Sequence, residues 1–437
     1  MNAAAAKPLT TALEQYRALF EARAYPDDAL TALRRTALEK FFALGFPTQR
    51  NERWKYTNLR RLESRSFQLA DPAPLARDTS QWLHDVGQRI AFVDGHCMPS
   101  LSGHSAHPPG VTVLTIGQWL KNSPDEVASF LSQAGWDTDN AFEALNTAFV
   151  EDGVIVDIAA DVQLDTPLYI VHQWQTPGRA AHPRVVIRAG RNSRATVIEH
   201  FVGLDDVESF TNSVVTIDAR AGARIAHYRL QQESAKTFHI GTLRARLERD
   251  AYLSSHEIAL GGALGRSDIT ALLEGSGAHA QLRGLFMPSG SQHLDNYTQI
   301  DHVAPHTTSD EEYRGIADGR GRGIFNGKVK VHQHAQKIDA RQLSRNLLLA
   351  ATAEIDTKPE LEIYANDVKC SHGATTGQLD PTALFYLRSR GLDASEARAL
   401  LIRAFAESIL ETIEPKGLRD ALEHWMRERF ARTGARR

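Results

Sequence analysis

The feature that most constrains the fold is a long series of short β-branched runs between about residue 150 and residue 378. Small polar turns separate many of these runs and recur about every 27–32 residues, with one later gap of about 42. No convincing helical pattern interrupts the series, whereas a βαβ fold needs a crossover helix of about a dozen residues. The runs are VIVDIA, LYIVHQW, RVVIRA, ATVIEHFV, SVVTIDA, RIAHYRL, YLSSHEIAL, KVKVHQH and ELEIYA, and the turns are AGRNSRA, ARAGARI, ERDAYLS, GSGAHAQ and DGRGRGI.

This spacing predicts a stacked solenoid, in which each coil covers the apolar surface of the next coil. An antiparallel sandwich is the alternative, but it would need more hairpin dipeptides than this region contains. We therefore predict a mainly β protein with a parallel β-helix core over residues 151–378.

A mostly helical pattern precedes the core, over residues 1–150. Residues 27–44 place apolar side chains on one helical face after an aspartate N-cap, and Gly45 ends the helix. Residues 123–126, Ser-Pro-Asp-Glu, are a second helix start. Between them, Asp94 and Gly95 form a dipeptide that is typical of a β-hairpin turn.

A helical pattern also follows the core, which predicts a C-terminal helical domain over residues 379–437. Asp380 and Pro381 begin one helix, and Asp393 begins a second helix with Glu396 in the capping-box position. The spacing predicts that the apolar face of this second helix consists of Ala397, Leu400, Leu401, Ala404, Phe405, Ser408 and Ile409.

Charge and composition exclude several classes of partner. Basic and acidic side chains number 50 and 53, and the net charge of −3 favours neither nucleic acid nor an anionic membrane. No apolar run reaches the roughly 20 residues needed to cross a bilayer, and the first residues do not resemble a secretory signal. With only two cysteines there is no disulfide framework, so a reducing cytoplasm is expected.

The glycine-rich segment DGRGRGIFNGKV at 318–329 superficially resembles a phosphate-binding loop. Such a loop needs glycine five residues before the Gly-Lys pair and Ser or Thr after it. Here Arg322 and Val329 occupy those positions, and the following residues alternate like a strand. The segment is therefore predicted to be a solenoid turn, and ATP hydrolysis is not expected of this chain alone.

The strongest candidate for metal chemistry is Cys370-Ser371-His372. Thiolate and imidazole suit iron, zinc or sulfur chemistry, and a C-x-H spacing in a strand places both side chains on one face. Two donors do not close a structural site, so a metal here would need ligands from another chain. A buried cysteine beside a histidine whose hydrogen bonds are satisfied is the alternative.

Other polar clusters are interpreted as structural. His332 and His334 share one face if KVKVHQH is wholly strand, and His96-Cys97 lies near the hairpin. Residues 301–315, DHVAPHTTSDEEYRG, could supply the paired acids of a β-helical enzyme that acts on polysaccharides. We predict instead that this segment is an exposed polar connection.

Four segments resemble the SufB/SufD family of the SUF iron–sulfur cluster assembly system. They are GFPTQRNERWKYTNLRRL at 45–62, ATVIEHFVGL at 195–204, GIFNGKVKVHQHAQKIDARQLSRNLLL at 323–349 and the long segment 357–406 that contains CSHGATTG. The first segment, and the absence from CSHGATTG of the additional cysteines that SufB carries, make the chain more similar to the SufD branch.

The resemblance implies a right-handed parallel β-helix between helical N-terminal and C-terminal domains. It also implies a complex in which the chain pairs with SufB through the β-helix and holds the ABC-type ATPase SufC through its C-terminal helices. The chain is then a non-catalytic scaffold that binds no cofactor stably and shares transient iron or a nascent cluster with SufB.

The family motifs also assign roles to particular residues. Cys370 and His372 fall in the segment implicated in cluster formation near the SufB junction, which implies a metal site shared with SufB. The expected SufC docking region includes Tyr386, Arg388, Arg390 and Phe405.

Three classes of function remain open from the sequence: an assembly scaffold, a polysaccharide-acting β-helix enzyme, and an interaction protein that only braces SufB. The sequence also leaves open the cluster type, a role in iron delivery, and whether the isolated chain pairs with a second copy of itself.

Overall fold

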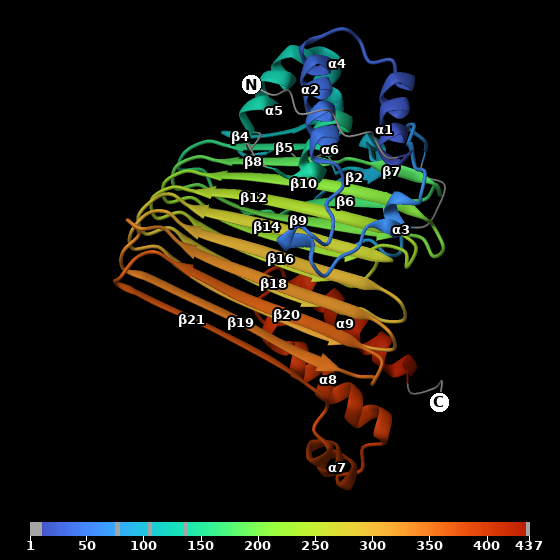
Figure 1. Cartoon of the computed structure of the whole chain (residues 1–437), viewed down its shortest axis with the longest axis vertical. Coiled ribbons are helices and arrows are strands. Elements are labelled where there is room, and N and C mark those ends of the chain that lie inside the picture. The colour runs from blue at the N-terminus through green and yellow to red at the C-terminus, as the bar shows by residue number, and fades with distance from the viewer. Residues whose placement is uncertain (1–10, 75–78, 104–106, 135–138, 434–437) are drawn as a thin grey trace.

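Two parallel sheets face each other and form a β-solenoid of about eight coils (Figure 1). The computed structural model describes residues 11–74, 79–103, 107–134 and 139–433. From residue 184 onward the chain alternates between the sheets, so strands pair in parallel with the strand two places later in sequence. The prediction of a mainly β chain with a parallel β-helix core and helices at both ends is confirmed.

The first sheet contains β1 (Gln68–Leu69), β4 (Val111–Thr115), β5 (Gly153–Ile158), β7 (Arg179–Ala181), β8 (Arg184–Ala189), β10 (Ser209–Ala219), β12 (Phe238–Leu247), β14 (Leu264–Leu273), β16 (His293–His302), β18 (Arg322–Val331) and β20 (Glu354–Ile363). The second contains β2 (Gln88–Val93), β3 (His96–Cys97), β6 (Leu168–Trp174), β9 (Arg194–Gly203), β11 (Arg224–Gln232), β13 (Tyr252–Ala259), β15 (His279–Phe286), β17 (Thr308–Ala317), β19 (Ile338–Leu348) and β21 (Val368–Gly377).

Residues that face the interior stack directly on their counterparts in the next coil, because the strands pair in register. One such column in the first sheet runs through Ile217, Ala245, Ala271, Ile300 and Val329. Each of these side chains is at most 1% exposed. Small and branched apolar side chains therefore form the continuous core between the two sheets.

Four successive corners that lead from the first sheet to the second use a residue with positive φ. Successive corners contain Asn192 (φ 55°), Gly222 (φ 69°), Asp250 (φ 58°) and Gly277 (φ 78°). A Cβ at Gly277 would lie 2.1 Å from the Asp250 Oδ1, so the glycine also makes room for its neighbour in the stack. These four residues lie within the polar turns predicted from the sequence, which explains why the turns recur.

The N-terminal end of the solenoid is closed by strands that turn back. β3 pairs antiparallel with β2, and β4 pairs antiparallel with β5. The hairpin between β2 and β3 has Asp94 and Gly95 at positive φ, as predicted for this dipeptide. Strands from residues 1–150 thus extend both sheets, and the three-domain division with boundaries at 150 and 378 stays a prediction.

The N-terminal helices cover this end and the neighbouring outer face of the first sheet (Figure 1). Asp28 caps α2 by accepting a hydrogen bond from the Thr31 N–H at 2.8 Å, as the sequence predicts. Phe142 of α6 packs with Phe210 and Phe238 of the sheet. The elements are α1 (Thr11–Ala22), α2 (Ala29–Leu44), α3 (Arg60–Glu63), α4 (Ile116–Asn122), α5 (Pro124–Ala134) and α6 (Ala141–Phe149), with 3-10 turns at Glu52–Trp54 and Pro99–Leu101.

The segment 45–62 lies along the outer face of the first sheet and is held there by a buried cation. The Arg266 guanidinium lies 3.9 Å from the centre of the Trp54 ring and pairs with Asp295. It also donates to the Arg53 carbonyl at 2.8 Å. Because Arg266 is 2% exposed, these contacts provide the compensation that a buried charge requires.

Three helices follow the solenoid: α7 (Pro381–Ser389), α8 (Ala394–Leu410) and α9 (Lys416–Thr433). Helices α8 and α9 cover the outer face of the second sheet, where Ile402, Ile409 and Leu422 join Tyr228 and Ile258 in one apolar cluster. Helix α7 projects beyond the solenoid (Figure 1).

The predicted apolar face of α8 is only partly correct. The Asp393–Glu396 capping box is present, and Ala397 and Ile409 are buried as predicted. Leu400, however, is 39% exposed, while Ile402 and Ala406 are buried. The helix is apolar around much of its surface, so its contacts with both the sheet and α9, rather than sequence spacing, decide which side is buried.

Replacement of Gly275 by alanine is expected to lower the free energy of unfolding by at least about 2 kcal/mol. A Cβ at this corner would lie 1.9 Å from the Arg249 backbone nitrogen, which cannot move without disturbing the coil below. Gly377→Ala is the matched control, because a Cβ there meets nothing within 4 Å. Urea denaturation of both variants measures the difference, and equal stabilities would contradict the close packing of this corner.

Candidate functional site

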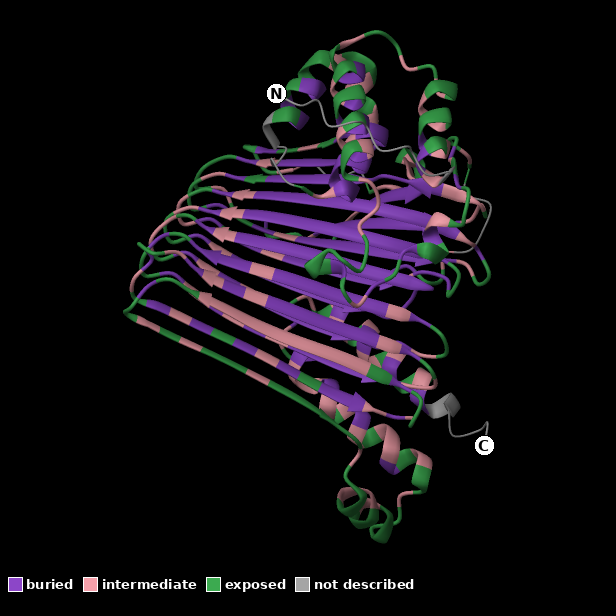
Figure 2. Ribbon diagram, viewed as in Figure 1, coloured by how far each residue is buried: buried purple, intermediate pink, exposed green. Residues whose placement is uncertain are grey.

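The C-terminal end of the solenoid is open, unlike the N-terminal end. Strands β20 and β21 are the last strands of their sheets, and within the described chain each pairs with a strand on one side only. Their residues are half-buried or exposed, whereas those of the inner coils are mostly buried (Figure 2). Two strands of ten residues each therefore present free backbone hydrogen-bonding groups.

The predicted pair Cys370 and His372 lies in β21, on this open edge. The register places Cys370 beside Ala340 and His372 beside Gln342 of β19. Ala340 and Gln342 are buried and face the interior, so Cys370 and His372 both lie on the inward face of the last strand. The shared face predicted from the C-x-H spacing is therefore present.

The two donors differ in their surroundings. Cys370 is half-buried against an apolar cluster that includes Val331 and Ala340, with Leu361 and Val368 beside it. This burial, with a smaller contribution from Asp339, raises the pKa of the Cys370 thiol and disfavours the thiolate. His372 is exposed on the same strand.

The thiol and the imidazole do not form a complete metal site. The described ranges contain no group of three or more His, Cys, Asp or Glu side chains arranged to hold a metal ion. Thiolate and imidazole nonetheless fit iron, and the edge position leaves space for further ligands. The donor set therefore fits a site that a second chain completes.

Below His372 lies a pair of buried polar side chains that sequence reasoning missed. The Gln342 amide donates to the Glu311 Oε2 at 2.7 Å, and Glu311 is the register partner of Gln342 on β17. Burial raises the pKa of Glu311 to about 7. Side chains of β19 point alternately inward and outward, and Gln342 is the inward-facing residue that pairs with His372. This alternation was the signal that could have identified Gln342.

The prediction that residues 301–315 form an exposed connection is wrong. Asp301 lies near the end of β16 and is 7% exposed. Most of the other residues of the segment belong to β17, in which Glu311 is 0% exposed. The segment contains the end of one strand, a corner at His306 and the start of another strand. We expected its acidic side chains to be exposed, as such side chains usually are. The interior of this solenoid holds polar side chains, and composition alone does not reveal this.

The other sequence candidates lie apart from this edge. Strand β18 ends at Val331, so His332 and His334 occupy the following turn and not the strand face that we predicted. Lys328 of the glycine-rich segment lies within β18 and pairs with Glu362 at 2.7 Å. The next element is β19, so this segment is a turn followed by a strand, as predicted.

The expected ATPase-docking residues divide into two groups. Tyr386, Arg388 and Arg390 are exposed on or beside α7, and the Arg390 guanidinium lies 5.3 Å from the Tyr386 ring centre. Phe385, which sequence reasoning missed, is 74% exposed and lies next to Tyr386. A helix with two exposed aromatic rings and no buried residue has the character of a binding surface.

Phe405 has a different position, because it packs between α8 and the second sheet. The Arg314 guanidinium lies 5.1 Å from the Phe405 ring centre and donates to the Phe405 carbonyl. The ring also contacts the apolar cluster beneath α8. Phe405 is therefore placed to connect α8 with β17.

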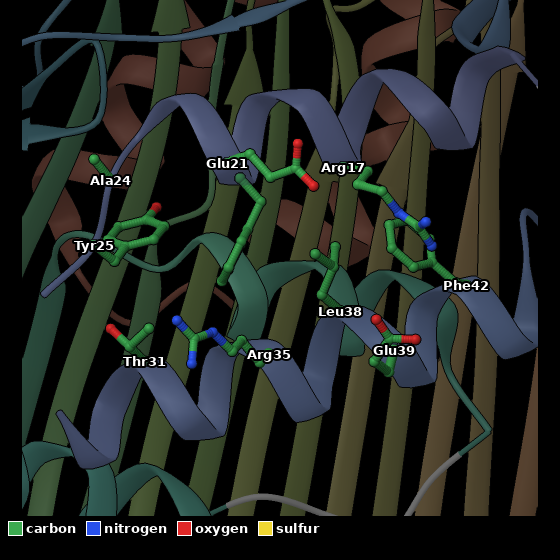
Figure 3. A pocket seen from close by; sticks show the side chains of 10 residues that line it. Arg17, Glu21, Ala24, Tyr25, Thr31, Arg35, Leu38, Glu39 and Phe42 are labelled. Atoms are coloured by element: carbon green, nitrogen blue, oxygen red, sulfur yellow. The ribbon is translucent and has the colours of Figure 1, made fainter. Parts of the chain in front are cut away.

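A separate groove of about 400 Å³ lies between α1 and α2 (Figure 3). Arg17 and Arg35 line it together with Glu21 and Glu39, so both signs of charge are present. The Arg17 guanidinium stacks 4.9 Å from the Phe42 ring centre. The described lining contains neither thiol nor imidazole, and the groove is remote in the fold from the open edge.

Comparison with known families covers nearly the whole chain. The SufBD core domain of SUF-system FeS cluster assembly matches residues 172–405, and the SufBD N-terminal region matches residues 9–170. The chain belongs to the SufB/SufD family. As a member of the SufB/SufD family, it is an iron–sulfur cluster assembly protein of the SUF system, as the sequence motifs predicted.

Known members of the SufB/SufD family are similar to the chain over most of its length. Iron-sulfur cluster assembly protein SufD of Escherichia coli is 33% identical over 94% of this chain and 95% of its own length. A SufBD family protein of Synechocystis is 32% identical over 91% and 90%. SufD of Bacillus subtilis is 27% identical over 72% of both chains. Among the helices described for this chain, none has the length and apolarity needed to span a membrane.

The positions of Phe405 and Phe385 predict that alanine will destabilise the chain at the first position and have little effect at the second. Phe405→Ala is expected to lower the free energy of unfolding by about 2 kcal/mol, less than for a fully buried phenylalanine because the ring is half-buried. Phe385→Ala should change it by less than about 0.5 kcal/mol. Urea titration checks both values, and a large loss with Phe385→Ala would mean that α7 is packed against the rest of the chain.

Proposed function

We propose that this chain is a non-catalytic scaffold subunit for iron–sulfur cluster assembly in the cytoplasm. It pairs with a SufB-like subunit through the open end of its solenoid and holds a SufC-like ATPase through its C-terminal helices. It contributes Cys370 and His372 to iron acquisition and to nascent cluster formation at the junction. The two free thiols are consistent with a reducing compartment.

The observation that carries this proposal is the difference between the two ends of the solenoid. The N-terminal end has antiparallel strands and helices over it, whereas β20 and β21 have free edges. Terminal coils of a solenoid need a cap, and a long unprotected edge is a site for pairing with another chain. Pro359 and ion pairs such as Lys358–Glu360 at 2.6 Å protect β20 in part, whereas the sequence of β21 contains no proline.

The partner must also complete the donor set. Cys370 and His372 supply two of the four ligands that iron or a cluster commonly takes from proteins. Metal binding requires the Cys370 thiol to lose its proton, and the positive charge of the metal offsets the burial that opposes this loss. A second open-ended SufB/SufD-type chain, with its own donors at the same edge, meets both requirements.

The C-terminal helices provide a connection between ATP hydrolysis in a partner and the open edge. Helix α8 is tied to β17 by the Arg314–Phe405 contact and by the hydrogen bond from Ser408 to the Glu312 carboxylate, 3.1 Å long. Arg398 of α8 donates to the Leu349 carbonyl just beyond β19 at 2.8 Å. Strand β19 is the only strand between β17 and β21 in the described part of the second sheet. Movement of α7 and α8 by the ATPase would therefore reach the strand that carries Cys370 and His372.

Such coupling requires different contacts in the two nucleotide states. Dimerisation of the ATPase on binding ATP would draw the C-terminal helices of the two subunits together. The resulting strain at the junction would expose its ligands to iron and sulfur.

Replacement of His372 by alanine is expected to abolish most cluster formation without dissociating the complex. The imidazole is exposed, so its loss should leave the fold of β21 unchanged. Co-expression with SufB-like and SufC-like subunits, followed by gel filtration and measurement of bound iron, tests both parts. His332→Ala is the matched control, because His332 lies in the turn that follows β18 and not in β21. Normal iron content in the His372 variant would reduce the role of the chain to bracing its partner.

Replacement of Phe385 and Tyr386 by alanine is expected to weaken binding of the SufC-like ATPase at least tenfold, because exposed aromatic rings dominate such contacts. The stability of the chain should not change, since the two rings are 74% and 57% exposed. Leu400→Ala, on the exposed side of α8, is the control. Isothermal titration with the ATPase measures the affinities. Unchanged binding by the double variant would place the docking surface elsewhere.

A further inference from the structure

Gln342 occupies a distinctive place among the inward-facing residues of β19. It is the register partner of His372, whereas Ala340 is the partner of Cys370, and Ser344 is the partner of Ala374. Partners on adjacent strands are about 4.8 Å apart. His372 is therefore the donor of β21 that has a long polar side chain directly beneath it.

The amide oxygen of Gln342 is a buried acceptor that lacks a donor. Gln342 is 3% exposed, and its Oε1 has no hydrogen-bond partner in the described structure. Its Nε2 is occupied by Glu311, which lies on the side of β19 opposite to β21. An unpaired buried carbonyl oxygen is unfavourable, so a hydrogen-bond donor that reached it would be stabilised.

The space around this amide is shaped by a glycine. Gly327 of β18 faces Gln342, and a Cβ at Gly327 would lie 2.2 Å from the Gln342 Nε2. Tyr313 and Phe325, whose rings stack with centres 4.6 Å apart, lie in the same part of the interior. The amide thus occupies a defined space, held at one end by the Glu311 carboxylate.

We propose that Gln342 is a positioning residue for His372: its amide oxygen accepts the N–H of the imidazole when a partner chain pairs with β21, so that the other ring nitrogen faces the junction and binds iron. Glu311 holds the amide in the orientation that directs its oxygen away from β17. The inference rests on the proposed function, because it assigns a supporting residue to the same site.

This arrangement follows the general chemistry of histidine ligands. A metal-binding imidazole usually donates its second N–H to a carbonyl or carboxylate, which fixes the tautomer and the direction of the ring. His372 has no such acceptor on the inward face of β21 itself, where its neighbours are Cys370 and Ala374. The free Gln342 oxygen supplies the missing acceptor.

The test uses the full chain in complex with its SufB-like and SufC-like partners, and iron(II) under anaerobic conditions as the probe. Gln342→Leu is expected to weaken iron binding about 10–100-fold, which is the usual effect of losing such a supporting hydrogen bond. The glutamate variant combines Gln342→Glu with Glu311→Gln, so that the amide at position 311 donates to the carboxylate at position 342. The second oxygen at position 342 stays free as an acceptor, and this variant should bind iron like the unchanged chain. Ser344→Ala, at the next inward position of the same strand, is the matched control and should have no effect.

A second readout distinguishes positioning from a general structural role. Nitrogen-15 spectra of the histidine rings, with the His372 signals assigned by His372→Ala, report which ring nitrogen carries the proton. The iron-free complex should show a single His372 tautomer, Gln342→Leu should show a mixture, and the glutamate variant should restore the single form. If the leucine variant does not fold, as thermal melting would show, Gln342→Met keeps the length without the amide and replaces it.

The outcomes separate this inference from the proposed function. If His372→Ala loses iron while Gln342→Leu retains normal affinity and a single tautomer, the role of Gln342 is overturned and the proposed function stands. If His372→Ala itself retains iron, both are overturned. A loss of affinity with the leucine variant that the glutamate variant restores, together with the change of tautomer, supports the positioning role.

Discussion

In-register pairing of parallel strands from coil to coil is the interaction on which the rest of this structure depends. It satisfies the backbone groups of every inner coil and stacks like positions above one another. The same rule creates a difficulty at the two ends, where pairing stops. At one end β3 and β4 resolve it by turning back, and at the other end β20 and β21 do not. Cys370 and His372, the donors of the proposed site, lie at the end where pairing stops.

The helices add a second level of organisation without covering that edge. The N-terminal helices pack on the first sheet, and α8 and α9 pack on the second. Helix α7, with its exposed aromatic rings, is separate from both contacts. The open edge of β21 and the exposed aromatic rings of α7 are therefore separate surfaces, and α8, which follows α7, is tied to β17 of the second sheet.

The architecture could be predicted from sequence largely because the corners have strict requirements. Asn192, Gly222, Asp250 and Gly277 recur because their four corners need a residue that tolerates positive φ, and such residues are easily seen. Helix caps such as Asp393 are visible for a similar reason, since their chemistry is local.

The interior and the support of the site were less predictable. Glu311 looked like an exposed acid because nothing local shows that Gln342 donates to it from the next coil. The buried side of α8 is likewise chosen by the sheet and α9 and not by spacing alone. Cys370 and His372 could be paired from their i, i+2 spacing, whereas their relation to Gln342 required the register between β19 and β21. Sequence therefore predicted features set by neighbours along the chain and missed those set by neighbours in the stack.

The packing of the last two helices over earlier coils has a consequence for biosynthesis. Thr412 contacts His256 at 2.9 Å, and the Glu414 N–H donates to Tyr228 at 3.3 Å, across 156 and 186 residues of chain. The ribosome makes these helices after the coils that they cover, so the apolar outer side of the second sheet is exposed to water until α8 and α9 have been synthesised. The solenoid of a nascent chain is thus complete before α8 and α9 cover its second sheet. We expect chaperones to bind the exposed apolar surface during this interval.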